Sequence, residues 1–399
     1  MVDVKRPATK NRAKNRAKTK TKARRIDGDS HFFPPVDFDG VAETLGVSQQ
    51  ALDMLLRDSS MFSDREARRG GFRASTAGKA AGAINPTAAT TSQDRGPIGH
   101  GVAASRVKLL PETGFDMQVL IPDGIFANPF GSPIERTWDK GLRMALSMSY
   151  NNATAKAQAE YPDQLIGTGV VPFGSDSVEA CAAEARRAVE TLGLKAITIS
   201  GNWRGENLDS VELYPFWETM NDLGVPLYVH GNPFQCQVND HIPTTFTLGW
   251  ERMRRLHVSN YLGFAFEYMM AMASLTLGGL LKEFPNLRFA FFEAGGSWLP
   301  WIMYTLDRVY EVEPQCARCE IPPSQHIRES CVVAVEPDER AIVGAIATIG
   351  SKNFIIGSDY PHPPSTYPNT AAGIEEMEGL SAEAKDDILG RNLVSFFNL

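Results

Sequence analysis

Asp29 and His31 lie two residues apart near the start of the chain, and both have side chains of the kinds that bind metal ions. The stretch 25–31 is predicted to be the end of a strand, and on a strand residues i and i+2 point to the same face. A carboxylate and an imidazole side by side form half of the ligand set of a typical transition-metal site. The remaining ligands would have to come from other strands.

Three more side chains of this kind each end an apolar run that is predicted to be a strand. They are His230 at the end of 225–230, Glu293 at the end of 289–293, and Asp359 at the end of 353–359. Singly, such a residue is commonly a helix N-cap or a hydrogen-bonded structural group. Repetition at several strand ends indicates a shared site, and imidazoles combined with carboxylates suit zinc, manganese or iron.

The elements that would position these residues alternate between apolar runs and amphipathic stretches. Further strands are predicted at 117–121, 165–172 and 195–199, and helical spacing recurs over 38–60, 133–160, 178–192, 214–223, 263–284, 297–311 and 380–397. Continuous apolar strands indicate a parallel sheet that is buried on both faces. About eight such units predict a (β/α)8 TIM barrel, in which the carboxyl ends of the strands meet at one mouth. The alternative is a doubly wound open sheet, although no Gly-x-Gly-x-x-Gly follows the first strand.

Two segments depart from this pattern, which leaves residues 26–399 for the barrel. Residues 1–25 are crowded with Lys and Arg and have almost no large apolar side chains. We expect a disordered basic tail there, with a docking arm for a partner or polyanion as the alternative. Residues 63–105 are rich in Gly, Ala, Ser, Thr and Arg, which predicts a loop insertion that acts as a lid or a partner-binding element.

The composition of the chain disfavours a nucleic-acid-binding protein and a membrane protein. The 399 residues have a formal net charge of −7, which does not favour a nucleic-acid partner. No apolar run approaches the ~20 residues that a bilayer span needs, so we expect no membrane association. Five sparse cysteines fit a reducing cytoplasm. Cys316 and Cys319 have C-x-x-C spacing, but without a second such pair we expect ordinary thiols rather than a zinc site.

A set of ordered motifs carries a family resemblance. They lie at residues 29–31, 227–233, 278–287, 293–301, 306–308, 357–362 and 388–393. Together they resemble the amidohydrolase superfamily, in the branch that includes aminocarboxymuconate-semialdehyde decarboxylase and the resorcylate-type decarboxylases. The resemblance runs from about residue 26 to the end of the chain and implies a metal-dependent hydrolase or decarboxylase. The implied substrate is a small carboxylated molecule such as an aromatic acid.

The resemblance also implies roles for particular residues. Asp29 and His31 resemble the first-strand metal pair, and His230 resembles the ligand of the fifth strand. Asp359 resembles the aspartate of the eighth strand, which binds metal and handles the proton of the attacking water. We expect one or two divalent ions, with zinc first and manganese or iron as alternatives.

Three residues have less certain assignments. Glu293 stands where many relatives carry His, so it is open whether it binds one metal, bridges two, or holds a substrate group. His257 and His362 are further catalytic candidates. His257 would support a ligand or contact the substrate, with an inert placement as the alternative, and His362 would transfer a proton or contact the substrate. A bridging Glu293 would favour a second hypothesis, a dinuclear non-haem iron or manganese oxygenase. A third is a non-catalytic partner subunit of such an enzyme. Related barrels commonly form dimers, so a homodimer or related hetero-oligomer is expected.

Overall fold

The computed structural model describes residues 24–56, 101–122, 140–174, 176–230, 258–362 and 365–399. Within them, eight parallel strands follow one another around a single sheet in chain order, each paired with the next. The strands are β1 (Ile26–Phe32), β2 (Met117–Pro122), β3 (Leu165–Val170), β4 (Ala196–Ile199), β5 (Leu227–Val229), β6 (Phe289–Phe291), β7 (Cys331–Val335) and β8 (Phe354–Ile356). Consecutive order from β1 to β8 confirms the predicted (β/α)8 barrel and excludes the doubly wound sheet.

The sheet closes between β1 and the segment that follows β8. The amide of His31 donates to the carbonyl of Tyr360 at 2.8 Å, and the amide of Ser358 donates to the carbonyl of Asp29 at 3.1 Å. Ser30 and Tyr360 form a parallel bridge at the same point. Closure therefore places the carboxyl ends of β1 and β8 side by side.

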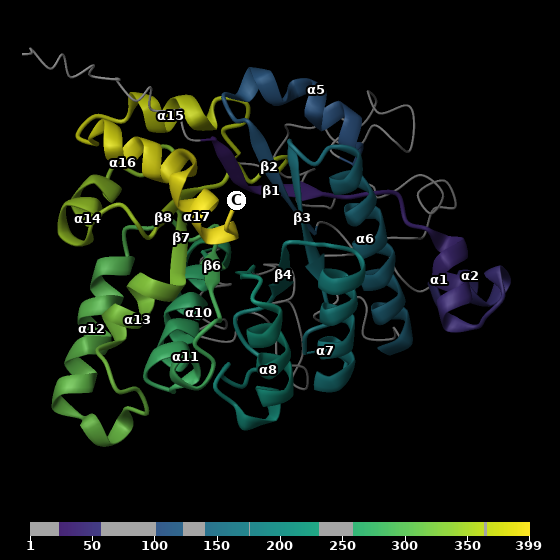
Figure 1. The fold of residues 1–399 in the computed structure, drawn as a ribbon, viewed down its shortest axis with the longest axis horizontal. Helices are drawn as coiled ribbons and strands as arrows, with labels where there is room; N and C mark the ends of the chain where they lie inside the picture. The colour runs from purple at the N-terminus through teal and green to yellow at the C-terminus, as the bar shows by residue number, and fades with distance from the viewer. Residues whose placement is uncertain (1–23, 57–100, 123–139, 175, 231–257, 363–364) are drawn as a thin grey trace, which may run out of the picture.

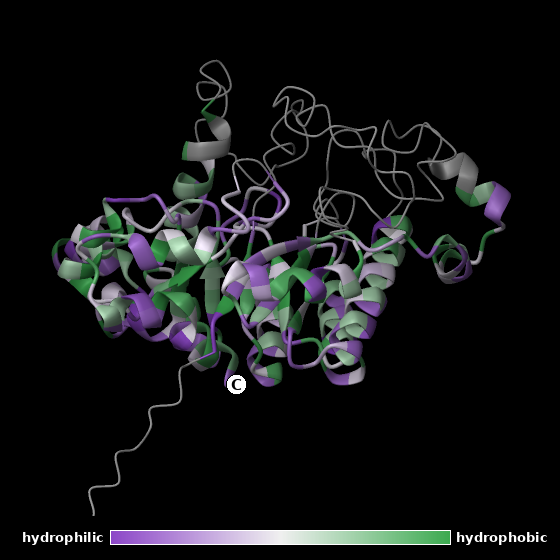
Figure 2. Ribbon diagram, turned by 90° about the horizontal axis from the view of Figure 1, so that it is seen from above, coloured by the Kyte–Doolittle hydropathy of each residue, from purple (hydrophilic) through white to green (hydrophobic). Residues whose placement is uncertain are grey.

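Helices surround the strands, as Figure 1 shows. They are α1 (Phe38–Leu45), α2 (Gln49–Leu56), α5 (Ala103–Thr113), α6 (Lys140–Glu160), α7 (Val178–Arg186), α8 (Tyr214–Leu223), α10 (Ser259–Thr276), α11 (Leu280–Glu283), α12 (Leu299–Val312), α13 (Pro323–Ser330), α14 (Ile342–Ile349), α15 (Thr370–Glu376), α16 (Ala382–Asp386) and α17 (Asn392–Phe397). Both hydrophobic and hydrophilic residues lie along these helices in Figure 2. This mixture is expected of helices that bury one face against a sheet.

The core has two layers because side chains alternate along each strand. Val119 and Ile121 of β2 point into the barrel, whereas Leu120 packs beneath the helices. Inside the barrel, Tyr228 stacks on Phe292 with ring centroids 4.6 Å apart. Leu393 and Phe396 of α17 join this inner cluster and fill the end of the barrel that faces the starts of the strands. The opposite end, where the strands finish, is left for polar side chains.

Some predicted boundaries were wrong for a local reason. The stretch 263–284 is not one helix, because Gly279 has φ 84° and α10 and α11 are separate. The stretch 38–60 divides in the same way at Gly46, which has φ 64°. Gly46 is the C-cap of α1, as glycine commonly is, whereas Gly279 is the N-cap of α11 and follows the end of α10 at Thr276. β7 was not predicted, although its five residues are all buried and apolar.

The tail and the insertion stay predictions. Residues 1–23 and 57–100 lie outside the described residues, and at the far boundary of the insertion α5 already begins at Ala103. Among the helices of the described ranges, none combines the length and the apolar composition needed to cross a membrane.

Candidate metal centre

All five predicted ligands meet at the carboxyl end of the barrel. Their ligand atoms fall into two overlapping groups, and within each group all atoms lie within 4.8 Å of one another. One group is Asp29, His31, His230 and Glu293, and the other is His31, Glu293, Asp359 and His362. The catalytic candidate His362 is thus part of the cluster, whereas His257 lies outside the described residues.

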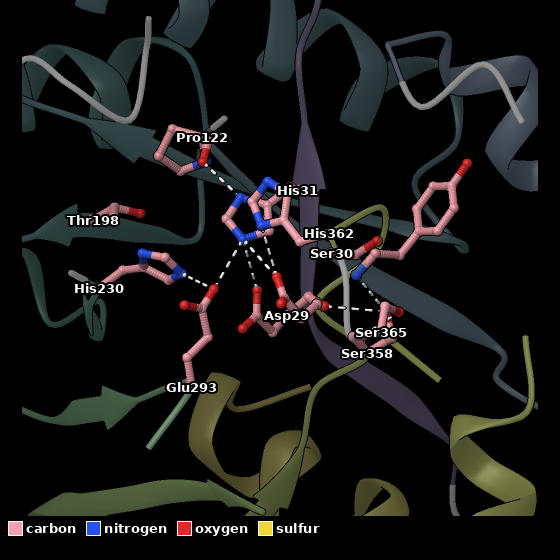
Figure 3. Close-up of polar contacts among 12 residues, drawn as sticks. Asp29, Ser30, His31, Pro122, Thr198, His230, Glu293, Ser358, His362 and Ser365 are labelled. Atoms are coloured by element: carbon pink, nitrogen blue, oxygen red, sulfur yellow. Dashed lines mark hydrogen bonds and ion pairs between the residues drawn. The ribbon is translucent and has the colours of Figure 1, made fainter. Parts of the chain in front are cut away.

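His31 is the centre of the cluster (Figure 3). Its Nδ1 lies 3.1 Å from the carbonyl of Pro122, to which it can donate. Its Nε2 lies 3.2 Å from Asp359 Oδ1, 3.4 Å from Glu293 Oε1 and 3.8 Å from Asp29 Oδ1. A carbonyl acceptor at Nδ1 fixes the tautomer whose Nε2 can bind a metal, which is the usual arrangement around metal-bound histidines.

The other two imidazoles flank His31. His230 Nε2 lies 3.0 Å from Glu293 Oε1, and His362 Nδ1 lies 2.9 Å from Asp359 Oδ1. The His362 ring sits 3.9 Å from the His31 ring. The side chain of His31 is 1% exposed and that of His362 is 38% exposed, so His362 forms the rim of the cluster. A substrate entering the barrel mouth could therefore reach His362.

Glu293 and Asp359 do not belong to strands, which corrects the predicted strand ends. β6 ends at Phe291 and β8 ends at Ile356. The two acidic residues have φ values of 60° and 52°, in the left-handed region that residues other than glycine rarely adopt. Such outliers persist only where the surrounding structure holds them, and they are common at functional sites.

A buried carboxylate that sequence analysis missed supports Asp359. Asp27 accepts hydrogen bonds from the Ser358 amide at 2.8 Å and the Ser358 hydroxyl at 2.7 Å. Gln118 Nε2 donates to the same carboxylate at 3.1 Å. Burial raises the pKa of Asp27 to about 6, although these donors oppose the rise. Asp27 therefore ties β1 to the residue directly before Asp359.

We expect Ser358→Ala to destabilise the fold by about 1–3 kcal/mol, because the buried Asp27 carboxylate loses a donor. Because the pKa of Asp27 is raised in the folded protein, the free energy of unfolding falls as pH rises and Asp27 ionises. The hydrogen bond from the Ser358 hydroxyl stabilises the ionised form and makes this fall smaller. The loss should thus be larger near about pH 8 than near about pH 5. Urea denaturation of both proteins at the two pH values measures it, and an equal loss at both would contradict this assignment.

Arg106 of α5 supports β1 in a similar way. The residue is 2% exposed, and it donates to the Ser30 hydroxyl at 2.6 Å and to the carbonyl of His31. Its guanidinium lies 5.3 Å from the ring centroid of Tyr360. Arg106 thus fixes the backbone of the residue at the centre of the cluster.

The charges of the cluster fit a divalent cation. Asp29 Oδ1 is buried and accepts no hydrogen bond from the described residues. Burial raises the pKa of Asp29 to about 7. Burial opposes protonation of His31, yet hydrogen bonds to Asp359 and Glu293 raise its pKa to about 10. His230 and His31 hold the pKa of Glu293 well below its usual range despite burial. Protons on the histidines thus balance the negative charge of the carboxylates, and a metal ion could balance it instead. Carboxylate oxygens and imidazole nitrogens are ligands that zinc, manganese and iron accept.

A further carboxylate at the mouth follows the strand that the sequence did not reveal. Glu336 comes directly after β7, between the strands that lead to Glu293 and Asp359. Glu336 as a whole residue is exposed, but crowding of protein atoms around its carboxyl group and the negative charges of Asp359, Asp29 and Glu293 raise its pKa to about 8. A cation bound to those three carboxylates would offset their negative charge and so lower the pKa of Glu336. The signal for this residue was the apolar run of β7.

Cys316 and Cys319 carry no metal cluster in the described part of the chain. The metal-ligand groups found there lie at the barrel mouth, and both cysteines are free thiols. The expectation of ordinary thiols stays a prediction.

Comparisons with known proteins agree with the fold and point to one family of enzymes. Residues 26–399 match the sequence model of the amidohydrolase family. The 2-amino-3-carboxymuconate-6-semialdehyde decarboxylase of Dictyostelium discoideum is 28% identical over 297 residues, which cover 74% of this chain and 76% of that protein. The gamma-resorcylate decarboxylase of Rhodococcus jostii is 24% identical over 273 residues, which cover 62% and 75%.

A solved structure shows the same architecture. The 5-carboxyvanillate decarboxylase of Novosphingobium aromaticivorans, complexed with manganese and 4-hydroxy-3-methoxy-5-nitrobenzoic acid, superimposes with a TM-score of 0.67. The alignment covers 94% of this chain and 96% of that chain at 20% identity. At this identity the likeness establishes the barrel fold.

Proposed function

Because the chain belongs to the amidohydrolase family, we propose that it is a metal-dependent decarboxylase or hydrolase of a small carboxylated molecule such as an aromatic acid. The observation that carries this proposal is the buried Asp29 oxygen, which accepts no hydrogen bond from any described residue and lies within a cluster of ligand atoms. The names of the similar decarboxylases favour decarboxylation over hydrolysis.

We infer that Asp29, His31, His230, Glu293 and Asp359 would hold the ion. Their ligand atoms lie within the two overlapping groups at the mouth. Zinc stays the first expectation, and the manganese in the carboxyvanillate decarboxylase structure supports manganese as the alternative. When bound, the ion supplies Lewis-acid polarisation of a substrate oxygen or of water.

The residues around that position can move the proton that the reaction needs. Asp359 accepts a hydrogen bond from His362 Nδ1 at 2.9 Å, which stabilises a protonated ring. In decarboxylation, the bond between carbon and the carboxyl group breaks, carbon dioxide leaves, and the electron pair on carbon takes a proton from His362 Nε2. In hydrolysis, Asp359 would instead accept a proton from the attacking water.

A substrate panel tests the proposal. The protein loaded with zinc or manganese is incubated with ortho-hydroxylated aromatic acids and with unsaturated amino acids that carry a carboxyl group, and released carbon dioxide is measured. Ester and amide analogues test hydrolysis in parallel. The variant His31→Ala is the negative control, called the blank, because it removes the central ligand of the cluster. Equal turnover by the blank would contradict a metal-dependent reaction at this site.

Metal affinity should rise with pH. At about pH 7 His31 still holds a proton in the metal-free protein, because its pKa is raised to about 10, and a metal ion must displace that proton. Calorimetric titrations in two buffers that differ in ionisation enthalpy measure the protons released. Affinity that stays constant between about pH 6 and pH 8, with no proton release, would show that His31 does not bind the ion.

A dinuclear oxygenase is the second candidate, because Glu293 and His31 belong to both ligand groups. Glu293 could bridge one ion held by Asp29 and His230 and another held by Asp359 and His362. Two iron or manganese ions per chain, with consumption of oxygen, would favour this function. One ion per chain favours the decarboxylase or hydrolase.

The homodimer, or a related hetero-oligomer, and the cytoplasmic location also stay proposals. Exposed apolar side chains at helical spacing on α10, Leu262, Phe266 and Met270, support an interface of some kind. Light scattering coupled to size-exclusion chromatography would measure the oligomeric state.

A further inference from the structure

We propose that Glu339 is a positioning residue of the metal centre, which holds the turn that carries Glu293. This inference rests on the proposed metal-dependent function. Glu339 lies in the segment between β7 and α14, whereas Glu293 lies in the turn between β6 and α12. The two turns are neighbours because β6 pairs with β7. Among the described residues, the hydrogen bonds recorded for the Glu339 carboxylate all come from backbone amides, so it would act through the backbone of the turn.

Three hydrogen bonds join Glu339 to that turn. The amide of Gly296 lies 3.0 Å from Oε1 and 2.9 Å from Oε2 of Glu339, and the amide of Ser297 donates to Oε1 at 2.7 Å. These amides precede α12, where the positive end of the helix dipole favours a negative group. Both carboxylate oxygens therefore serve as acceptors for one short turn.

The turn fits closely around this carboxylate. Gly295 has φ 63°, and a Cβ placed there would lie 2.9 Å from Glu339 Oε1. A Cβ on Gly296 would lie 2.9 Å from a side-chain carbon of Val335 and 3.0 Å from one of Ile342. Two adjacent glycines thus allow the backbone to approach the carboxylate on one side and the core on the other.

The hydrogen bonds from the Gly296 and Ser297 amides to Glu339, which we call the clamp, matter because Glu293 is in an unfavourable backbone conformation. Its φ of 60° is rare for a residue with a side chain, and such a conformation persists only when its surroundings hold it. Glu293 Oε1 approaches both His230 and His31, so a small movement of the turn would displace a ligand common to both groups. Glu339 fixes this turn at Gly296, which is three residues after Glu293 in the chain.

The chemistry of the amides explains why a carboxylate is needed. Two backbone N–H groups of the turn converge on Glu339, and the amide of Glu336 lies 3.4 Å from its Oε2. An ionised carboxylate offers acceptors to them on both oxygens. A glutamine of the same length would offer one acceptor oxygen and turn an NH2 group toward an N–H donor. Glu339→Gln thus preserves volume while it removes part of the clamp.

The test compares Glu339→Gln with a matched control, Asp307→Asn. Asp307 on α12 also accepts a backbone amide before a helix, that of Ser324 at 2.8 Å, and it is outside the metal-ligand groups of the described residues. Both variants are expected to lower the melting temperature. We expect only Glu339→Gln to weaken zinc and manganese binding, by about tenfold to a hundredfold, as loss of an outer support of a metal ligand typically does.

A spectroscopic measurement separates positioning from stability. Cobalt(II) loaded into each protein reports the geometry of its ligands through its visible absorption, and we expect a changed spectrum in Glu339→Gln and an unchanged one in Asp307→Asn. Unchanged affinity and spectrum in Glu339→Gln, with wild-type binding intact, would overturn the role of Glu339. Absence of metal binding by the wild-type protein would instead overturn the proposed function.

Discussion

Asp359→Asn is expected to lower kcat by at least about a hundredfold, because the residue would lose its ability to accept or stabilise a proton. In the structure Asp359 Oδ1 lies 2.9 Å from His362 Nδ1 and 3.2 Å from His31 Nε2. An asparagine oxygen could preserve one of these contacts but carries no negative charge to stabilise a protonated His362. The measurement is steady-state turnover of whichever carboxylated substrate the panel identifies, together with metal content.

Metal content separates the two roles of Asp359. Four other predicted ligands would stay in place, so the variant should retain a measurable part of its metal while activity falls. Asp386→Asn is a suitable control, since Asp386 pairs with Arg391 on the surface. Retention of more than about half of the activity would contradict proton transfer through Asp359, since a general acid or base typically contributes at least about a hundredfold. If the protein is active only in an assembly with a second subunit, unchanged turnover of that assembly in Asp359→Asn would favour the hypothesis of a non-catalytic partner subunit.

Much of the cluster could be predicted because its signals are local. The spacing of Asp29 and His31 fits one face of a strand, and the structure confirms that both side chains reach the cluster. His230 was predicted from an apolar run that ends beside it, and β5 does end at Val229. Barrel topology then brings strand ends together, so a pattern along the chain becomes a site in space.

The residues that support the cluster could not be predicted in this way. Asp27 contacts Ser358, and Glu339 contacts Gly296, across long separations in the chain. Gly296 and Ser358 lie within motifs, but no spacing along the chain links either residue to its partner, since each contact depends on which loops the closed barrel brings together. The left-handed backbone of Glu293 was also hidden, because an apolar run followed by a carboxylate resembles a longer strand.

The missed β7 has a different cause. Its residues from Cys331 to Val335 are all apolar and buried, so the sequence does contain a short apolar run there. A strand of this length is hard to distinguish from a segment of buried helix by pattern alone. The consequence was functional, since Glu336 follows the strand directly and adds another carboxylate to the mouth.

Metal removal is expected to abolish activity, and one equivalent of the native ion should restore it. His31 Nδ1 lies 3.1 Å from the Pro122 carbonyl, and Glu293 Oε1 lies 3.0 Å from His230 Nε2. Because these contacts lie within the protein, we expect chelation to leave the site assembled. Metal binding should also raise the free energy of unfolding, by about 2.7 kcal/mol when the concentration of free ion is a hundred times its dissociation constant. Dialysis against a chelator, then titration with zinc, manganese or ferrous iron under anaerobic conditions, measures both effects.

The shape of that titration decides between the two candidate functions. Activity that reaches its maximum at one ion per chain fits a decarboxylase or hydrolase, in which Asp359 binds the ion and handles protons together with His362. A requirement for two iron or manganese ions, with consumption of oxygen, fits the oxygenase, because His362 would then join Asp359 as a ligand of the second ion. His31→Ala should regain neither activity nor stability at any ratio of metal to protein. Recovery of that variant by added metal would show that the ion acts somewhere other than this cluster.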